Sequence, residues 1–424
     1  MKIKTKKVSY DEVLKLPYRE HKMPVKPSKL LKKLILALSK SELKKVNFHY
    51  ESEGMDKLKK DEPCLILMNH SSFIDLKIAE TIFKDRDLQI VMTSDGFVGK
   101  EWLMRRIGCI PTQKFVTDLT LVKDMKYCVD NLKTSVLLFP EASYSFDGTA
   151  TPLPDSLGKF IKLLGVPVVF IETFGAFHRD PLYNGLRLRD VNVSAKVNYI
   201  LSPEDTKEKS VSEINTILKN CFSFDYFAWQ KNTGLKVSED FRATGLERVL
   251  YKCRSCGVEG QMKGQDTWLT CNSCGAKYEM DELGQMRSGD EIIHIPDWYK
   301  WQREQVREEI KTEKYKLDIP VDIKLLKDMN AIYEVGEGRL VHDVNGFRLS
   351  GLDGKLDYNQ AVKASYSLYS DYFWYEIGDM ICIGDNKILY YCFPKVENVD
   401  VAKARLATEE MYKLNYREKK QVTS

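Results

Sequence analysis

Short, nearly continuous apolar runs recur along the first half of the chain and predict buried strands. They are CLILM at 64–68, LQIVMT at 88–93, SVLLFP at 135–140, VPVVFIETF at 166–174 and VSAKVNYI at 193–200. Several stretches between them repeat apolar residues every three or four positions, as amphipathic helices do. These are EWLMRRIG at 101–108, LTLVKDMKYCVDNLK at 119–133 and LPDSLGKFIKLLG at 153–165. The alternation predicts an α/β domain with helices flanking a sheet.

Residues 26–44 combine an apolar stripe with lysines and predict a basic amphipathic helix. The stripe consists of Leu30, Leu31, Leu34, Ile35 and Leu38, with Lys32, Lys33 and Lys40 opposite. Such a helix suits the interface of an anionic membrane, where lysines lie near lipid head groups. It suits equally well a helix that covers the core of the next domain, because most apolar stripes pack against a core.

Beyond residue 250 the pattern changes to short strands and two helices. PDWYKWQREQVREEIKTEKYK begins with Pro and Asp and predicts a linker helix over 296–318. From residue 319 onward, short strands lead to a terminal helix that begins near 401, which predicts a small barrel or a bent sheet. The aromatic run YSLYSDYFWYEIG at 366–378 fits the core of a strand better than a surface facing lipid or protein.

Composition and charge indicate a folded chain with several domains. A length of 424 residues exceeds one ordinary domain, and 43% hydrophobic with 30% charged residues excludes a disordered chain. The net charge is only +4, yet residues 1–50 hold 14 Lys and Arg against 4 Asp and Glu. This excess of positive charge around the amphipathic stripe favours contact with an anionic membrane surface.

The sequence predicts a cytoplasmic protein, peripheral on the inner face of the membrane. No apolar run approaches the length of about 18 to 20 residues that a spanning helix needs, and the N-terminus lacks a signal-peptide pattern. Four of the ten cysteines form two CxxC pairs and the others have apolar neighbours, which favours a reducing compartment.

The two cysteine pairs predict a structural zinc site in a ribbon at 248–285. Cys253, Cys256, Cys271 and Cys274 follow the spacing C-x2-C-x14-C-x2-C, which suits four thiolates around one Zn²⁺. Four protein ligands leave no open position for a reacting water.

The charges of this ribbon argue against nucleic acid as a partner. Three basic residues between 253 and 280 are offset by three acidic ones, so no basic footprint is present. We therefore expect no nucleic-acid binding and interpret the ribbon as a scaffold or a docking module for a partner.

The strand predicted at 64–68 runs into NHSSFID, in which an aspartate follows a histidine by five residues. On a continuous helix five residues advance about 500°, so only a turn could bring His70 and Asp75 together. In such a turn Asp75 would orient the imidazole, leaving its other nitrogen to remove a proton from a hydroxyl. The N–H groups of Ser71 and Ser72 would then help to hold an anion if they open a helix. The alternative is a histidine at a strand end with satisfied hydrogen bonds.

Four motifs together resemble the sequence blocks of the glycerolipid acyltransferase family, which includes 1-acylglycerol-3-phosphate acyltransferases. They are NHSSFID at 69–75, GCIPTQK at 108–114, FPEASYS at 139–145 and VPVV at 166–169. The resemblance covers roughly residues 45–200 and implies an acyltransferase-type mixed sheet with flanking helices. It also implies that His70 is the general base, that Asp75 orients it, and that acyl-CoA or acyl-carrier protein donates the acyl group directly.

The second and third blocks depart from the family pattern. Lys114 stands where an arginine is usual, and Ala142, Ser143 and Tyr144 replace Gly, Thr and Arg, while Glu141 matches. By position, Lys114, Glu141, Ser143 and Tyr144 are the expected substrate-binding residues. The arginine that grips phosphate in the family is absent, which leaves the acceptor open.

The resemblance implies transfer of a fatty acyl group to a hydroxyl of a lysophospholipid-type acceptor. The nearest reaction converts 1-acyl-sn-glycerol-3-phosphate to phosphatidic acid, a step of phospholipid biosynthesis. Two alternatives stay open. One is acyl transfer to an acceptor without glycerophosphate, and the other is a non-enzymatic zinc-ribbon binding protein on an acyltransferase-like fold.

The expected organisation has five parts. These are an N-terminal helical region at 1–45, an acyltransferase domain at 46–235, a zinc ribbon at 248–285, a linker helix at 296–318, and a small β-rich domain with a terminal helix at 319–424. The expected partners are an anionic membrane surface, the acyl donor with acyl-carrier protein as a candidate, and a lyso-lipid acceptor.

Overall fold

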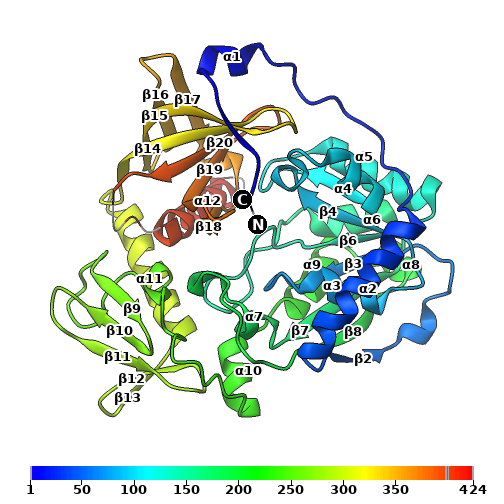
Figure 1. Ribbon diagram of the computed structural model, residues 1–424, viewed down its shortest axis with the longest axis horizontal. Coiled ribbons are helices and arrows are strands. Elements are labelled where there is room, and N and C mark those ends of the chain that lie inside the picture. Colours follow the sequence, from blue (N-terminus) through cyan, green and yellow to red (C-terminus); the bar gives the residue numbers. More distant parts are fainter. Residues whose placement is uncertain (1, 397–398, 400, 423–424) are drawn as a thin grey trace.

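Three β-sheets organise the computed structural model, which describes residues 2–396, 399 and 401–422. A seven-stranded sheet with flanking helices lies on the right of Figure 1, a five-stranded sheet at the lower left and an eight-stranded sheet at the upper left. This succession agrees with the predicted α/β domain, ribbon and β-rich domain with its terminal helix.

The seven-stranded sheet is mixed, as predicted. Its order is β2-β8-β7-β3-β6-β4-β5, and β8 is antiparallel to β7 while the other neighbours are parallel. The strands are β2 (His49–Glu53), β3 (Leu65–Met68), β4 (Leu88–Thr93), β5 (Cys109–Thr112), β6 (Ser135–Leu138), β7 (Val168–Phe174) and β8 (Ser194–Leu201). The central strand β3 is wholly buried, which explains its unbroken apolar sequence.

Helices cover this sheet at the places that the sequence predicts and at several others. They are α2 (Lys29–Lys45), α3 (Asp75–Ile82), α4 (Glu101–Ile107), α5 (Leu119–Tyr127), α6 (Leu157–Leu164), α7 (Ala176–Arg179), α8 (Pro203–Glu208), α9 (Val211–Cys221) and α10 (Tyr226–Thr233). Short turns add η1 (Met55–Lys57), η2 (Ser94–Phe97), the π-helical η3 (Cys128–Leu132), η4 (Leu182–Asn184) and η5 (Leu246–Arg248). No helix among the described residues is both long and apolar enough to cross a membrane.

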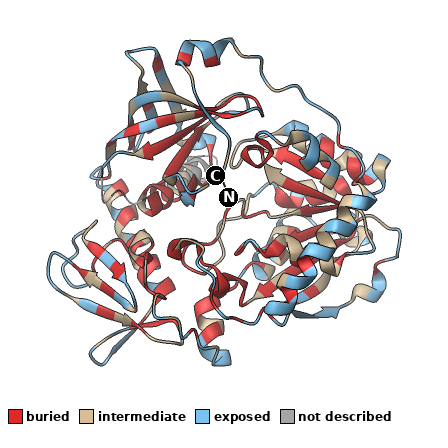
Figure 2. Cartoon of the chain, in the orientation of Figure 1, coloured by how far each residue is buried: buried red, intermediate tan, exposed pale blue. Residues whose placement is uncertain are grey.

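The residues of the predicted apolar stripe on α2 face two directions: some pack against the domain and others face solvent. Leu43 is buried, and Leu31 and Ile35 are half-buried against the domain. Leu30, Leu34 and Leu38 instead remain 77%, 53% and 66% exposed. Figure 2 shows exposed residues along α2. The helix therefore covers the domain and also presents a row of leucines outward.

The five-stranded sheet forms the ribbon and continues beyond its predicted end. Its antiparallel order is β13-β12-β11-β10-β9. The strands are β9 (Met262–Gln265), β10 (Trp268–Cys271), β11 (Lys277–Met280), β12 (Gln285–Ser288) and β13 (Glu291–His294). The next helix, α11 (Ile295–Lys311), is fixed to the ribbon end: Trp298 Nε1 donates to the Lys252 carbonyl at 2.9 Å and Gln302 Nε2 to the Val249 carbonyl at 2.8 Å.

The eight-stranded sheet builds the C-terminal domain. Its main order is β17-β16-β15-β14-β20-β19-β18. The strands are β14 (Leu317–Leu326), β15 (Ile332–Asp343), β16 (Gly346–Gly351), β17 (Leu356–Ala361), β18 (Tyr369–Trp374), β19 (Gly378–Gly384) and β20 (Leu389–Pro394), with η6 (Val362–Ala364) and the terminal helix α12 (Val401–Val422).

The N-terminal residues join this last sheet, which the sequence analysis does not anticipate. Strand β1 (Thr5–Lys7) pairs in parallel with β15, Thr5 opposite Ile332. The short helix α1 (Tyr10–Lys15) follows, and the chain then crosses to α2, as Figure 1 shows. The predicted N-terminal region at 1–45 is therefore divided between two domains.

Helix α12 is joined to α11 by ion pairs and to the domain of the seven-stranded sheet by a hydrogen bond. Glu409 lies 2.6 Å from Arg303 Nη1 and 3.3 Å from Arg405 Nε. Arg405 Nη1 also donates to the carbonyl of Tyr144 at 3.5 Å, within the third block. The C-terminal helix thus packs directly behind that block.

Candidate active site

A tight turn between β3 and α3 brings His70 and Asp75 together. His70 Nδ1 lies 3.0 Å from Asp75 Oδ2, which also accepts the N–H groups of Ser71 at 2.8 Å and Ser72 at 3.0 Å. Asp75 is buried at the first position of α3. The two N–H groups thus hold the carboxylate of Asp75 within the turn and do not face the cavity as a site for a bound anion.

The hydrogen bond to Asp75 determines which nitrogen of His70 is free to accept a proton. Because a carboxylate only accepts, Nδ1 carries the proton and Nε2 is left with a lone pair. Nε2 has no hydrogen-bond partner among the described residues, and His70 lines a large cavity. Burial lowers the pKa of His70 below its ordinary 6.5, and Asp75 opposes that shift. At neutral pH the imidazole is therefore neutral and able to accept a proton.

Two aromatic residues of the third block hold the His70 ring from both sides. The ring centroid lies 4.3 Å from that of Phe139 and 4.1 Å from that of Tyr144. Between them, Ala142 has φ of 54°, in the left-handed region that favours glycine. At Ala142 the loop therefore keeps the left-handed backbone conformation that suits the glycine found at this position in the family.

Glu141 connects the third block to the first. Its Oε2 accepts the N–H of His70 at 3.1 Å, and its Oε1 accepts the N–H of Thr151 at 2.8 Å. Burial raises the pKa of Glu141 to about 7, against the lowering effect of these hydrogen bonds. Ser143 Oγ donates to the Tyr144 carbonyl at 3.1 Å. Glu141 and Ser143 thus lie behind the cavity wall, whereas Lys114 and Tyr144 line the cavity.

The cavity has a volume of about 2110 Å³ and extends from His70 between two domains. One part of its wall is apolar and comes from β5, α5 and α6. The apolar side chains on that part include Leu121, Val122, Met125, Leu157, Phe160 and Leu163. A wall of this kind suits a fatty acyl chain, because burial of each methylene is favourable by about 0.8 kcal/mol.

The opposite wall comes from the C-terminal domain and could not be assigned from the sequence. Tyr369 and Trp374 are buried in the sheet, as predicted for the aromatic run, yet they also line the cavity. Asp371 lies between them in β18 and lines it too. A carboxylate among alternating aromatics is the signal in the sequence that could have indicated a site here.

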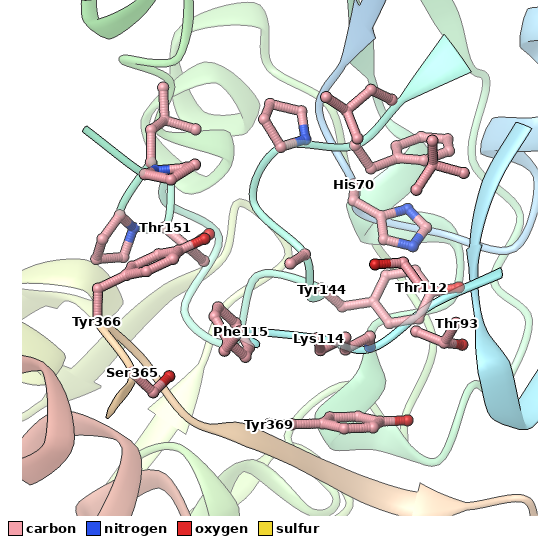
Figure 3. Close-up of a pocket in the computed structure, with 18 of the residues that line it drawn as sticks. His70, Thr93, Thr112, Lys114, Phe115, Tyr144, Thr151, Ser365, Tyr366 and Tyr369 are labelled. Atoms are coloured by element: carbon pink, nitrogen blue, oxygen red, sulfur yellow. The ribbon is translucent and has the colours of Figure 1, made fainter. Parts of the chain in front are cut away.

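Lys114 lies deep in the cavity between the two walls. Its Nζ is 4.2 Å from the centroid of the Tyr369 ring, an arrangement that Figure 3 shows together with His70 and Tyr144. Burial lowers the pKa of Lys114, while Asp371 and Asp95 act in the opposite direction. Its positive charge in turn lowers the pKa of His70.

Replacing Lys114 with methionine is expected to shift the pH dependence of a reaction that uses His70 as its base. Such a base works only when unprotonated, so the activity falls as the pH drops through the pKa of His70. Loss of the Lys114 charge raises that pKa, and the acid limb of kcat/KM moves to higher pH. The control is Lys123→Met, which changes an exposed lysine on α5 and should leave the pH of the acid limb of kcat/KM unchanged. If the acid limb of Lys114→Met stays at the pH of the unaltered protein, this electrostatic coupling is contradicted.

The four predicted zinc ligands converge at one end of the ribbon. The Sγ atoms of Cys253 and Cys274 are 3.8 Å apart, as are those of Cys256 and Cys271, and all four lie within 4.8 Å of one another. Sulfurs around a tetrahedral zinc with Zn–S bonds of about 2.3 Å are separated by about 3.8 Å. The cluster therefore fits a structural zinc ion.

Comparison with known proteins agrees with this description of the first domain. Residues 49–171 match a protein-family model described as Acyltransferase, a range that spans all four blocks. The resemblance of this part of the chain to acyltransferases is thereby confirmed. Among solved structures, the chain is similar to the 1-acyl-sn-glycerophosphate (LPA) acyltransferase PlsC from Thermotoga maritima. The identity is 18% and the TM-score 0.34, with 46% of this chain and 79% of that chain covered.

Proposed function

We propose that the protein transfers an acyl group from a thioester to a hydroxyl at His70, a proposal supported by the match of residues 49–171 to the family model described as Acyltransferase. The observation that carries the proposal is the 3.0 Å hydrogen bond from His70 Nδ1 to Asp75, which leaves Nε2 free at the cavity. A base oriented in this way is the arrangement that activates a weak hydroxyl nucleophile.

The proposed reaction is a direct transfer. His70 Nε2 takes the hydroxyl proton as the acceptor oxygen attacks the thioester carbonyl. The carbon–sulfur bond then breaks, and the leaving thiolate takes the proton from the imidazolium. Asp75 stabilises the imidazolium formed in between. The products are an ester and one free thiol, from coenzyme A or acyl-carrier protein.

The acceptor that we propose differs from 1-acyl-sn-glycerol-3-phosphate, the acceptor in the nearest reaction of the family. A phosphate monoester at this position would need cations near His70, and Tyr144 stands where the family has an arginine. Arg405 approaches the same loop but is buried and bonded to Glu409 and to the Tyr144 carbonyl. We therefore favour the alternative of an acceptor without glycerophosphate.

The proposal is tested by free-thiol release. Purified protein is mixed with acyl-CoA or acyl-carrier protein and a panel of monoacylated acceptors, beside the His70→Ala variant. We expect at least one acceptor to raise thiol release above that of the variant. If none does, the enzymatic proposal is overturned, and a zinc-ribbon binding protein becomes the better description.

We also propose that α2 attaches the protein to an anionic membrane, in keeping with the predicted location on the inner face of the membrane. Leu30, Leu34 and Leu38 face outward on a helix that also carries exposed lysines, so apolar and electrostatic attraction act together. The cavity would then receive its acyl donor and acceptor near a lipid surface.

The double variant Leu34→Glu and Leu38→Glu is expected to lose binding to vesicles that contain anionic lipid. Each leucine that enters the membrane interface gains apolar burial, and the glutamates of the variant lose this gain. We therefore expect sedimentation with vesicles to decrease by about ten-fold or more. The control is Ile292→Glu, an exposed apolar residue on the ribbon strand β13, which keeps binding. Undiminished binding of the double variant would remove α2 as the anchor.

A further inference from the structure

Three charged side chains from separate segments line the cavity that His70 also lines. Lys114 follows β5, Asp95 lies in η2 after β4, and Asp371 belongs to β18 of the C-terminal domain. All three line the cavity. The acyltransferase domain thus supplies one cation and one carboxylate, and the C-terminal domain adds a second carboxylate.

Two of these groups have buried atoms with no hydrogen-bond partner among the described residues. Asp95 is 2% exposed, and its Oδ2 accepts from Tyr369 Oη at 2.7 Å and from Trp374 Nε1 at 3.1 Å. Its Oδ1 is unpaired, as is Oδ1 of Asp371. Buried carboxylate oxygens are rarely left unpaired, because the lost hydration is then not replaced. Both residues line the cavity, so their carboxyl groups suit the hydroxyl groups of a bound molecule.

Lys114 supplies donors to the same space. Within the described part of the chain its ammonium group makes no ion pair or hydrogen bond, and it lies over the face of the Tyr369 ring. An ammonium offers three N–H donors. A molecule with hydroxyl groups can therefore accept from Lys114 and donate to Asp95 and Asp371 at once.

The balance of charge in this space disfavours a phosphate. One cation faces two carboxylates, and a dianion placed beside Lys114 would also lie near Asp95 and Asp371. Burial raises the pKa of Asp371 to about 7, so this carboxyl group both donates and accepts near neutral pH. A neutral ligand meets no such repulsion.

The other cations that line the cavity do not alter this balance. Arg303 and Lys413 lie 3.2 Å and 2.7 Å from Glu410. Four further lysines are exposed at the rim. They are Lys159, Lys219, Lys300 and Lys363. Among the described residues that line the cavity, Lys114 therefore has no second inward-facing cation beside it in place of the family's arginine.

We propose that the acceptor is an uncharged lipid with several free hydroxyl groups, of the monoacyl glycolipid or monoacylglycerol class. Its polar part lies among Lys114, Asp95 and Asp371, and one of its hydroxyls reaches His70 Nε2. The inference rests on the proposed acyl transfer. The acceptor is then selected by residues from both the acyltransferase domain and the C-terminal domain.

The test compares acceptors that share one acyl chain and differ in the head group. They are 1-acyl-3-glucosylglycerol, 1-acylglycerol, 1-acyl-sn-glycerol-3-phosphate and 1-acylglycerophosphoethanolamine, assayed by thiol release with His70→Ala as the baseline. We expect kcat/KM for the better neutral acceptor to exceed that for either phosphate-containing acceptor by about ten-fold or more. Equal or greater kcat/KM with a phosphate-containing acceptor overturns the inference but leaves the acyltransferase. Thiol release at baseline with every acceptor overturns the acyltransferase itself.

A variant tests the role of the C-terminal carboxylate. Asp371→Asn keeps the shape but removes the charge, and we expect the ratio of kcat/KM for neutral over phosphate acceptors to fall about five-fold or more. Asp155→Asn, an exposed cavity carboxylate near the start of α6, leaves the ratio unchanged. An unchanged ratio in a folded Asp371→Asn protein would overturn the assignment of Asp371. The wild-type comparison decides the acceptor class independently of how the variant folds.

Discussion

We expect the replacement of His70 with alanine to reduce acyl transfer by about 10²- to 10⁴-fold, which is the range that general-base catalysis contributes. The loss appears in kcat rather than in KM, because the imidazole acts on the proton in the transition state. Free-thiol release under saturating donor and acceptor measures it. The fold should persist, since the His70 side chain lines a cavity and makes its hydrogen bond to Asp75 alone among the described residues.

A second histidine provides the control for this experiment. His49→Ala changes an exposed residue on the edge strand β2, and its activity should equal that of the unaltered protein. Circular dichroism of both variants separates a chemical loss from a structural one. If folded His70→Ala retains activity within about two-fold of the unaltered protein, His70 is not the base.

Removing the zinc site produces the second large effect. Cys271→Ser is expected to abolish binding of one zinc ion per chain and to unfold the ribbon, because structural zinc contributes about 10 to 16 kcal/mol to the folding of small modules. Metal analysis under reducing conditions and thermal unfolding measure the loss. Cys221→Ser, a half-buried cysteine outside the ribbon, keeps the metal and the melting temperature.

The loss of zinc should also reduce acyl transfer, although the metal contacts no substrate. The ribbon end holds Trp298 and Gln302 of α11, Arg303 of that helix pairs with Glu409 of α12, and Arg405 of α12 bonds the third block. A zinc-free protein that keeps full activity would show that this series of contacts does not support the site. Detection of no zinc in the unaltered protein would refute the metal site directly.

Much of the acyltransferase domain could be predicted because its signals are local. Strand β3 is apolar at every position and ends in a motif whose histidine and aspartate lie within one turn. The helix that begins at Asp75 is not among the predicted helices, and the sequence analysis allows only a helix start near Ser71 and Ser72. The roles of Glu141 and Ser143 depend on where their side chains point, which spacing along the chain does not determine.

The second wall of the cavity could not be predicted, for a different reason. Tyr369 and Asp371 lie about three hundred residues from His70 in sequence, and alternating aromatics indicate only that a strand is packed on something. Strand β1 gave no signal at all, because its three residues are Thr, Lys and Lys and all are exposed. The contacts between segments far apart in the sequence are thus the part of this site that only the three-dimensional structure reveals.

The pairing of β1 with β15 has a consequence for the order in which the molecule matures. During synthesis Thr5–Lys7 leaves the ribosome early, but its partner residues Ile332–Glu334 follow more than three hundred residues later. The acyltransferase sheet between them can fold first, since domains generally fold as units as they emerge. The cavity gains its second wall only when β18 and α12 have been made. A nascent chain therefore holds His70 and Asp75 in place before the second wall of the cavity exists.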